Sequence, residues 1–173
     1  EKRDHKKVKV FNLQPYLFKN KPEKLQMVYA GAMLPKAYSL LEKIFLAFQN
    51  NPNIFENVEI HFIGTGKTPT DPKGYTIKPF AEKYGLWQKN IFEYPQRIPY
   101  LDVLVHLNAA NAVFILGSTE PHYTPSKVYQ AVLSGKPILA VLHSMSSAVE
   151  VLTKSGAGYV VDFANETECE LKM

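Results

Sequence analysis

Short apolar runs alternate with amphipathic stretches along most of this chain. The apolar runs are typical of buried strands, and the stretches between them carry apolar residues at helical spacing. The clearest run is 113–117, Val-Phe-Ile-Leu-Gly, which reads as a buried parallel strand. The predicted strands cover 26–30, 58–63, 90–93, 113–117, 138–142 and 159–162. The predicted helices cover 38–50, 76–84, 99–108, 124–134 and 146–155.

This alternation predicts the fold class. Strands that alternate with helices form a mainly parallel sheet with helices on both faces, so we expect a doubly wound α/β domain. In the commonest strand order of such domains, the first and fourth strands are neighbours at the topological switch point. The loops that follow them, 31–36 and 117–124, should then face one crevice. Gly31 and Gly117 end the two strands.

We expect three segments along the chain. Residues 1–24 read as a basic connector, in which Val8, Val10, Phe11 and Leu13 could form an edge strand. Residues 25–163 form the α/β domain, and residues 164–173 form a polar tail that we expect to be truncated. The chain starts at Glu1 without a methionine, which suggests a piece of a longer protein.

Composition narrows the class of protein. Of the 173 residues, 46% are hydrophobic and 21% are charged, which is typical of a globular domain. No apolar run approaches the roughly 18 residues that a membrane-spanning helix needs. Cys169 is the single cysteine, so neither a disulfide framework nor a cysteine metal cluster is expected. A reducing, cytoplasmic location follows as the expectation.

The positive charge is concentrated at the start of the chain. Residues 1–24 hold eight Lys or Arg against three acids, whereas the remainder holds 12 against 13, out of a total net charge of +4. A basic segment could contact an anionic surface, such as the inner face of a membrane. It could equally be a solvated linker. No nucleic-acid-binding motif accompanies it, so nucleic acid is not an expected partner.

The segment after the fourth strand predicts an anion site. Thr124 is a suitable N-cap, Pro125 suits the first helical position, and Gly135 suits the position just after the helix. Lys127 then falls in the first helical turn, where a cation opposes the helix dipole. An anion at this helix start would remove that conflict, because free backbone N–H groups point outward there. We expect the anion to be a phosphate.

The residues Pro125-Ser126-Lys127, Gln130, Gly135-Lys136-Pro137 and Gly64-Thr65-Gly66 resemble a known family. The pattern over about 25–162 is similar to the C-terminal half of retaining GT-B glycosyltransferases with an E-x7-E motif. The resemblance implies a Rossmann-like domain that binds a nucleotide-sugar donor. It also implies an N-terminal half, missing here, that holds the acceptor. Three positions depart from the family pattern, which has Glu at Gln130 and at His122 and often Arg at Ala32.

The resemblance also suggests roles for particular residues. Lys36, Lys127 and the backbone around Ser126 would hold the diphosphate, while Gly31 allows close backbone approach. Gln130 lies three residues after Lys127, shares its helix face, and would contact the ribose. The remaining candidates for the nucleotide are Gly64, Gly66, Tyr94, Pro95, Arg97, Thr124 and Pro125. His122 or Glu120 would contact the transferred sugar. Each of these residues could instead belong to a solvated surface or an ordinary turn.

The predicted function is donor binding within a hexosyltransferase that acts on a saccharide or lipid-linked acceptor. The catalytic residues would be Lys36, Lys127, His122 and Glu120, with Lys36 and Lys127 stabilising the departing nucleoside diphosphate. We expect no metal and no cofactor, since His5, His61, His106 and His143 lack metal-ligand spacing. We also expect the isolated domain to be inactive alone. Two alternatives remain, a sugar-nucleotide epimerase of the same architecture and a non-catalytic nucleotide-binding or scaffold domain.

Overall fold

The computed structural model describes residues 2–10, 13–165, 167–168 and 172. Within these residues, one sheet of parallel strands has the order β3-β2-β1-β4-β5-β6. The doubly wound α/β fold is therefore confirmed, and the first and fourth strands are neighbours as predicted. The strands are β1 (Leu25–Ala30), β2 (Val58–Ile63), β3 (Ile91–Tyr94), β4 (Ala112–Leu116), β5 (Ile138–His143) and β6 (Gly158–Phe163).

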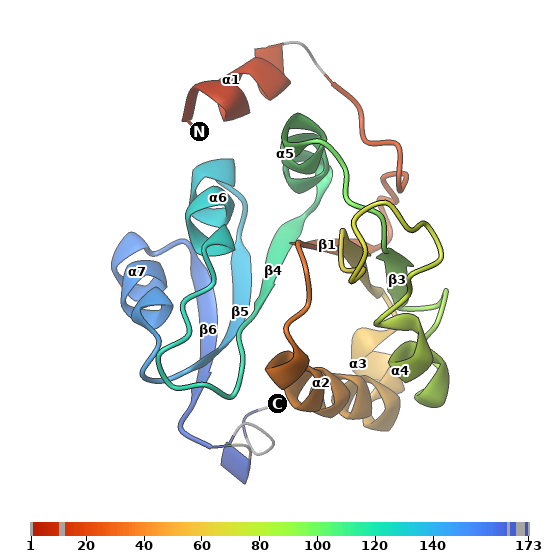
Figure 1. The fold of residues 1–173 in the computed structure, drawn as a ribbon, viewed down its shortest axis with the longest axis vertical. Helices are drawn as coiled ribbons and strands as arrows, with labels where there is room; N and C mark the ends of the chain where they lie inside the picture. The colour runs from red at the N-terminus through yellow and green to blue at the C-terminus, as the bar shows by residue number, and fades with distance from the viewer. Residues whose placement is uncertain (1, 11–12, 166, 169–171, 173) are drawn as a thin grey trace.

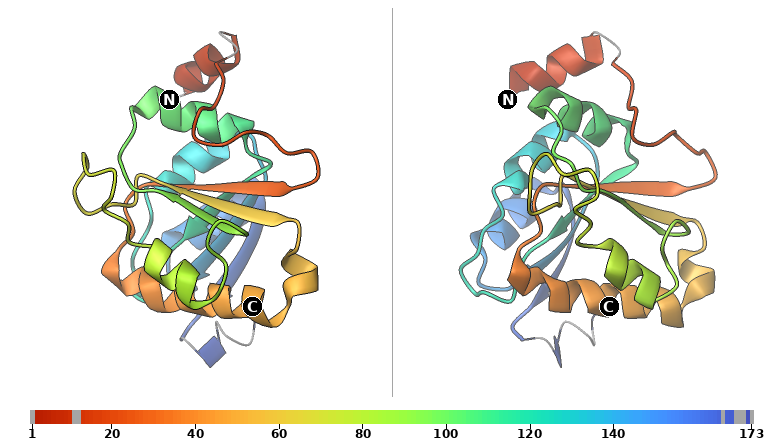
Figure 2. Two further views of the ribbon diagram at one scale, coloured as in Figure 1. Left: turned by 90° about the vertical axis from the view of Figure 1, so that its right-hand side faces the viewer. Right: turned by 45° about the vertical axis from the view of Figure 1, so that its right-hand side comes forward.

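Helices lie on both faces of the sheet (Figures 1 and 2). On one face lie α2 (Tyr38–Asn50), α3 (Pro52–Phe55) and α4 (Lys78–Lys83), with a short 3-10 helix, η1 (Pro35–Ala37), before α2. On the other face lie α5 (Tyr100–Ala109), α6 (Lys127–Ser134) and α7 (Ser147–Ser155). The N-terminal helix α1 (Lys2–Val10) packs on α5 and α6. The sequence did not predict α3.

A hydrophobic core fills each side of the sheet. On the α2 side, the apolar stripe predicted for 38–50 is buried against the rings of Tyr29, Phe62 and Phe114. On the α5 side, Val28, Ile63 and Ile115 pack beneath α5, α6 and α7. The buried residues of the α2 stripe are Leu40, Leu41, Ile44, Phe45 and Phe48.

The leading segment differs from the predicted connector. The edge strand suggested for Val8, Val10, Phe11 and Leu13 does not form, because Val8 and Val10 belong to α1. Val8 is buried against the α5 side of the core. Phe11 lies outside the described residues.

Residues 13–24 cross the α5 face over β2 and β3, and we call this segment the strap. The ring of Phe18 stacks on His61 at 4.4 Å between centroids. The backbone N–H groups of Tyr16 and Leu17 both donate to Nε2 of His106, at 3.3 and 3.2 Å. Nε2 of His106 must therefore carry no proton, and burial lowers the pKa of His106, which favours this neutral form of the ring. On this part of the α5 face, the strap rather than a helix covers β2 and β3.

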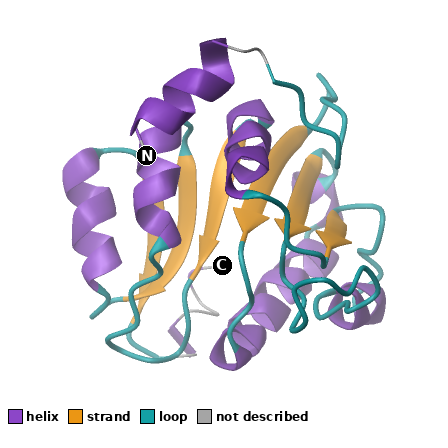
Figure 3. Ribbon diagram, turned by 45° about the horizontal axis from the view of Figure 1, so that its top comes forward, coloured by secondary structure: helices purple, strands orange, loops and turns teal. Residues whose placement is uncertain are grey.

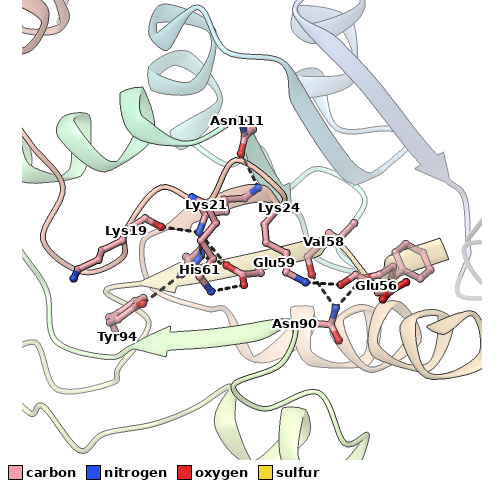
Figure 4. Close-up of polar contacts among 12 residues, drawn as sticks. Lys19, Lys21, Lys24, Glu56, Val58, Glu59, His61, Asn90, Tyr94 and Asn111 are labelled. Carbon is pink, nitrogen blue, oxygen red and sulfur yellow. Dashed lines mark hydrogen bonds and ion pairs between the residues drawn. The ribbon is translucent and has the colours of Figure 1, made fainter. Parts of the chain in front are cut away.

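A buried polar network anchors the strap to β2 (Figure 4). Lys21 Nζ lies 2.7 Å from Oε1 of Glu59, a carboxylate that is 2% exposed. The amide of Gln26 donates to Oε2 of Glu59 at 2.9 Å and to the Lys19 carbonyl at 3.1 Å. Burial raises the pKa of Glu59, but these hydrogen bonds outweigh it and leave the pKa below its ordinary value. Burial lowers the pKa of His61, 3.4 Å from Glu59, to about 4.

None of the helices among the described residues has the length and apolar character needed to cross a membrane.

Candidate functional site

The carboxyl ends of the parallel strands, drawn as arrowheads in Figure 3, meet at one edge of the sheet. There the loop 31–37 after β1 lies against the loop 117–126 after β4, and we call the pair the junction loops. The Thr119 N–H donates to the Lys36 carbonyl at 3.2 Å. Lys36 Nζ lies 2.6 Å from Oε1 of Glu120, and both side chains are exposed. The structure therefore brings together two loops that are far apart in the sequence.

Lys127 lies between the two junction loops. Its ammonium is 3.6 Å from the centroid of the Tyr29 ring, on β1. A Cβ built on Gly31, whose φ is +122°, would lie 3.5 Å from the same Nζ. Burial lowers the pKa of Lys127 to about 7. Among the described residues, no carboxylate forms an ion pair with this ammonium, so the cation has a ring for a neighbour but no counter-ion.

The start of α6 differs from the prediction. The helix begins at Lys127, and Ser126 precedes it with helical dihedrals (φ −57°, ψ −24°) and no side-chain cap. Thr124 is not the N-cap, since Ser126 holds that position, and the Thr124 hydroxyl lies 2.7 Å from Oγ of Ser147, at the start of α7. Pro125 is buried and lies before the helix rather than at its first position. The end of the helix is as predicted, with Gly135 at φ +69°.

The other residues proposed for the sugar and ribose are placed around this helix start. Gln130 shares a face of α6 with Lys127, and both line a small hollow next to Ala30 and Val113. This face lies toward the sheet, and Gln130 is half-buried. His122 is exposed on the loop before α6, two residues after Glu120. Glu120 forms the ion pair with Lys36, whereas the side chain of His122, on the same loop, is exposed to solvent.

The glycines after β2 have a structural explanation. The N–H of Gly64, at φ +71°, donates to the Tyr94 carbonyl at 2.8 Å, and the N–H of Gly66 donates to the Pro95 carbonyl at 3.0 Å. A Cβ on Gly66 would lie 2.9 Å from that same Pro95 oxygen. Gly64 and Gly66 thus join the loops after β2 and β3, at a distance of two strands from β4.

Tyr94, Pro95 and Arg97 line a pocket of about 370 Å³ after β3. Arg97 is exposed, and its N–H donates to the Pro69 carbonyl at 2.9 Å. The Tyr94 hydroxyl is 3.3 Å from Nδ1 of His61, and burial raises the pKa of Tyr94 to about 12. Two further rings, Tyr16 from the strap and Tyr75 from the loop after β2, line the same pocket. Sequence reasoning missed both, because neither follows a strand directly.

Glu93 was also missed, although it is a buried carboxylate in a strand. Its oxygens accept hydrogen bonds from the backbone N–H groups of Thr76, Ile77 and Lys78 at 2.8–3.0 Å, and from the Thr65 hydroxyl at 2.6 Å. Glu93 thus caps the start of α4 from the neighbouring strand. An acid at an inward-facing position of a predicted strand was the available signal. This helix start has its own anion, whereas that of α6 has none among the described residues.

In the part of the chain that the structure describes, no group of three or more His, Cys, Asp or Glu side chains gathers as a metal site.

Comparisons with known proteins rest on structure alone, since no protein-family model and no curated protein sequence matches the chain. A UDP-forming trehalose-phosphate synthase from Burkholderia xenovorans matches 99% of this chain with a TM-score of 0.65 and 15% identity. WaaG, a glycosyltransferase involved in lipopolysaccharide biosynthesis, matches 87% with a TM-score of 0.61 and 14% identity. A putative UDP-N-acetylglucosamine 2-epimerase from Listeria monocytogenes matches 95% with a TM-score of 0.55 and 11% identity.

The chain covers 41%, 37% and 41% of these three structures, in the same order, so it spans about two fifths of their length. At identities this low, the likeness concerns the fold. The strand order, the helices on both faces and these matches together show that the chain has the Rossmann-like fold of one half of a GT-B protein, as its resemblance predicted.

Proposed function

We propose that the chain binds the diphosphate of a nucleotide sugar at the junction loops, as the donor-binding half of a hexosyltransferase. The acceptor, a saccharide or a lipid-linked sugar, would bind mainly to an N-terminal half. Support comes from the fold, which the chain shares with a UDP-forming synthase and with WaaG. The position also fits, because ligands of doubly wound sheets bind at the strand ends where the order reverses, here between β1 and β4.

The observation that carries the proposal is the unpaired ammonium of Lys127. A half-buried cation without a counter-ion is costly, and its pKa falls toward neutrality for that reason. The position at the first residue of α6 adds the unfavourable field of the helix dipole. A diphosphate between the junction loops would remove both costs, since it would pair with Lys127 and accept hydrogen bonds from the helix start.

Lys36 provides a second cation that can be exchanged. Its ion pair with Glu120 is exposed, and such pairs contribute roughly 0–1 kcal/mol. A diphosphate can therefore replace Glu120 as the partner of Lys36 at little cost. In the transfer step, Lys36 and Lys127 would stabilise the charge that develops on the leaving nucleoside diphosphate, so the proposal requires no metal ion. Glu120, once released, and His122 would be free to contact hydroxyl groups of the sugar.

The nucleoside would extend from the junction loops toward β3. Gln130, next to Lys127, would contact the ribose, and the pocket lined by Tyr94, Pro95 and Arg97 would receive the base. The rings of Tyr16 and Tyr75 and the guanidinium of Arg97 are suited to stacking on a base.

Thermal denaturation with UDP, GDP, ADP and their glucose conjugates tests this function. We expect one nucleotide series to raise the melting temperature, because a ligand at a hundredfold excess over its Kd stabilises by about 2.7 kcal/mol. Lys127→Met should abolish the shift, and Lys89→Met, which removes an exposed lysine on another loop, should retain it. Chelation of divalent ions with EDTA should leave the shift unchanged. No shift with any nucleotide, or an equal shift in Lys127→Met, would contradict the proposal.

The epimerase reading is supported by the match to the Listeria structure. A turnover assay with UDP-N-acetylglucosamine, run without and then with an added saccharide acceptor on the chain joined to its proposed N-terminal half, separates the two activities. Formation of a new sugar nucleotide would identify an epimerase, whereas transfer that depends on an added acceptor would identify a glycosyltransferase. Nucleotide binding without either product would favour the scaffold reading.

A further inference from the structure

A second hollow lies at the carboxyl edge of the sheet, beside the junction loops. Its volume is about 480 Å³, within the usual range of small-molecule sites. The loop after β2 forms one wall, and the first residue of α2, Tyr38, forms part of another. Tyr38 follows Lys36 by two residues, so this hollow begins close to the Lys36–Glu120 pair. Tyr75 lies between this hollow and the pocket proposed for the base and lines both, whereas the other residues of the hollow have no part in the nucleotide roles proposed above.

Aromatic rings form the apolar part of this hollow. The rings of Tyr38 and Phe80 stack at 5.2 Å with an interplanar angle of 14°. Tyr75 supplies a third ring, which is 38% exposed. Trp87 makes an edge contact with the Tyr75 ring at 5.8 Å between centroids, and the Lys78 ammonium lies 5.1 Å from the Tyr75 ring centroid. Tyr75 is thus in contact with two side chains that do not line the hollow.

The polar part of the hollow carries both signs of charge. Asp71 contributes an exposed carboxylate, and its Oδ1 accepts a hydrogen bond from the Lys73 N–H at 2.8 Å. Lys67 contributes an exposed ammonium, and Thr68 contributes a hydroxyl. One acid and one base give no net charge, which fits a neutral ligand better than a phosphate. Their oxygens and nitrogen can accept from and donate to several hydroxyl groups.

We propose that this hollow is a subsite for a neutral pyranose of the acceptor saccharide. A pyranose has apolar C–H faces that pack on aromatic rings and a rim of hydroxyl groups that bond to a carboxylate, a hydroxyl and an ammonium. The proposal rests on the proposed function, because an acceptor must lie beside the place where the diphosphate leaves. The subsite goes beyond the proposed function, because it assigns part of acceptor recognition to the donor-binding half.

Trp87 gives the test a built-in reporter, since it is the one tryptophan in the sequence and contacts Tyr75. The fluorescence of Trp87 is titrated with the methyl pyranosides of glucose, galactose, mannose and N-acetylglucosamine, with and without UDP. We expect a saturable change with at least one pyranoside. Sorbitol, which has the hydroxyl groups but no ring, serves as the control and should cause no saturable change. Absence of a saturable change with all four pyranosides would overturn the proposal.

Substitutions in the hollow test whether the pyranoside binds there. Tyr38→Ala should weaken pyranoside binding about tenfold, the loss expected for one aromatic contact. Asp71→Asn removes the charge of an exposed carboxylate on the polar side of the hollow and should also weaken pyranoside binding. Tyr129→Ala, which removes an exposed ring on α6, is the control and should bind normally. Equal affinity in Asp71→Asn and the wild type would place the saccharide elsewhere.

The nucleotide shift of the same variants separates the two proposals. Asp71→Asn should keep the full stabilisation by nucleotide, and Lys127→Met should keep pyranoside binding. A wild-type protein that shows the nucleotide shift but no pyranoside signal would overturn this subsite and leave the proposed function intact. A wild-type protein that shows the pyranoside signal but no nucleotide shift would contradict the proposed function instead.

Discussion

Lys127 shows how far a single residue could be interpreted from its sequence context. The Thr-Pro-Ser-Lys pattern after an apolar strand predicted the first helical turn for Lys127, and the structure has this residue at the start of α6, with its ammonium near Gly31. The ring of Tyr29 beneath the ammonium could not be predicted, because it belongs to a strand much earlier in the chain. The low pKa follows from this surrounding and not from the local sequence.

The lowered pKa predicts that donor binding takes up a proton. At pH 8 the free Lys127, with a pKa of about 7, is mostly neutral, whereas a bound diphosphate raises the pKa and keeps the lysine charged. UDP-glucose should therefore bind with uptake of about one proton at pH 8, and its affinity should fall as the pH rises above 7. Calorimetry in buffers of different ionisation enthalpy measures this uptake.

UDP-glucose is the better ligand for this measurement, because a terminal phosphate such as that of UDP ionises near pH 6 by itself. Lys89→Met should show the same uptake as the wild type. Tight binding with no uptake at pH 8 would mean that Lys127 does not contact the diphosphate.

At the scale of the elements, the sequence placed most strands and helices within a few residues of their observed bounds. The exceptions have partners that are distant in the sequence. α6 begins at Lys127, and the hydroxyl of Thr124, the predicted N-cap, contacts Ser147 of α7 instead of the start of α6. The start of α4 depends on Glu93, which is supplied by the next strand. Local cap signals fail where the capping group comes from another element.

Glu93→Gln should destabilise the domain by about 2–3 kcal/mol. The amide loses the charge of the carboxylate, and its NH₂ group would face backbone N–H donors, which leaves buried donors unsatisfied. Urea unfolding should show a lower midpoint with an unchanged m-value. Glu82→Gln on the exposed side of α4 is the matched control and should lie within about 0.5 kcal/mol of the wild type. An equally small effect of Glu93→Gln would contradict the capping role.

At the scale of the whole molecule, the strand order and the switch point could be predicted, because they follow from alternation and from a strong regularity of doubly wound sheets. The strap could not. Its lysines and prolines suggested a connector, and the cover that it gives to β2 and β3 depends on Glu59, His61 and His106. The hollow beside Tyr38 could not be predicted from the sequence either, since its side chains come from three separate segments.

The strap makes stability depend on pH in the acid range. Burial lowers the pKa of His61 to about 4 and also lowers that of His106, so between pH 6.5 and 4 the unfolded chain binds more protons than the folded one. The free energy of unfolding should therefore decrease as the pH falls through this range. Protonation of His106 would also break the hydrogen bonds from Tyr16 and Leu17.

His61→Phe should reduce this pH dependence, because the phenyl ring does not titrate. It fits the position, since His61 lies between the rings of Phe18 and Phe92 at 4.4 and 4.9 Å. Urea unfolding of both proteins at about pH 6.5 and about pH 4.5 measures the difference. A mutation of exposed His122 to Phe is the control and should leave the pH dependence unchanged. Identical slopes for wild type and His61→Phe would refute the assignment.

The narrow pairing between β1 and β4 has a consequence for motion. These strands share two register pairs, Met27 with Ala112 and Val28 with Val113, whereas β1 and β2 share six. The pairing of β1 with β4 is therefore the shortest in the sheet, and the junction loops lie at its carboxyl end. A molecule that binds to both loops would connect the strands β3-β2-β1 to the strands β4-β5-β6 at this short pairing. Ligand binding at the junction loops and ordering of the β1–β4 pairing would then be thermodynamically coupled, so that each favours the other.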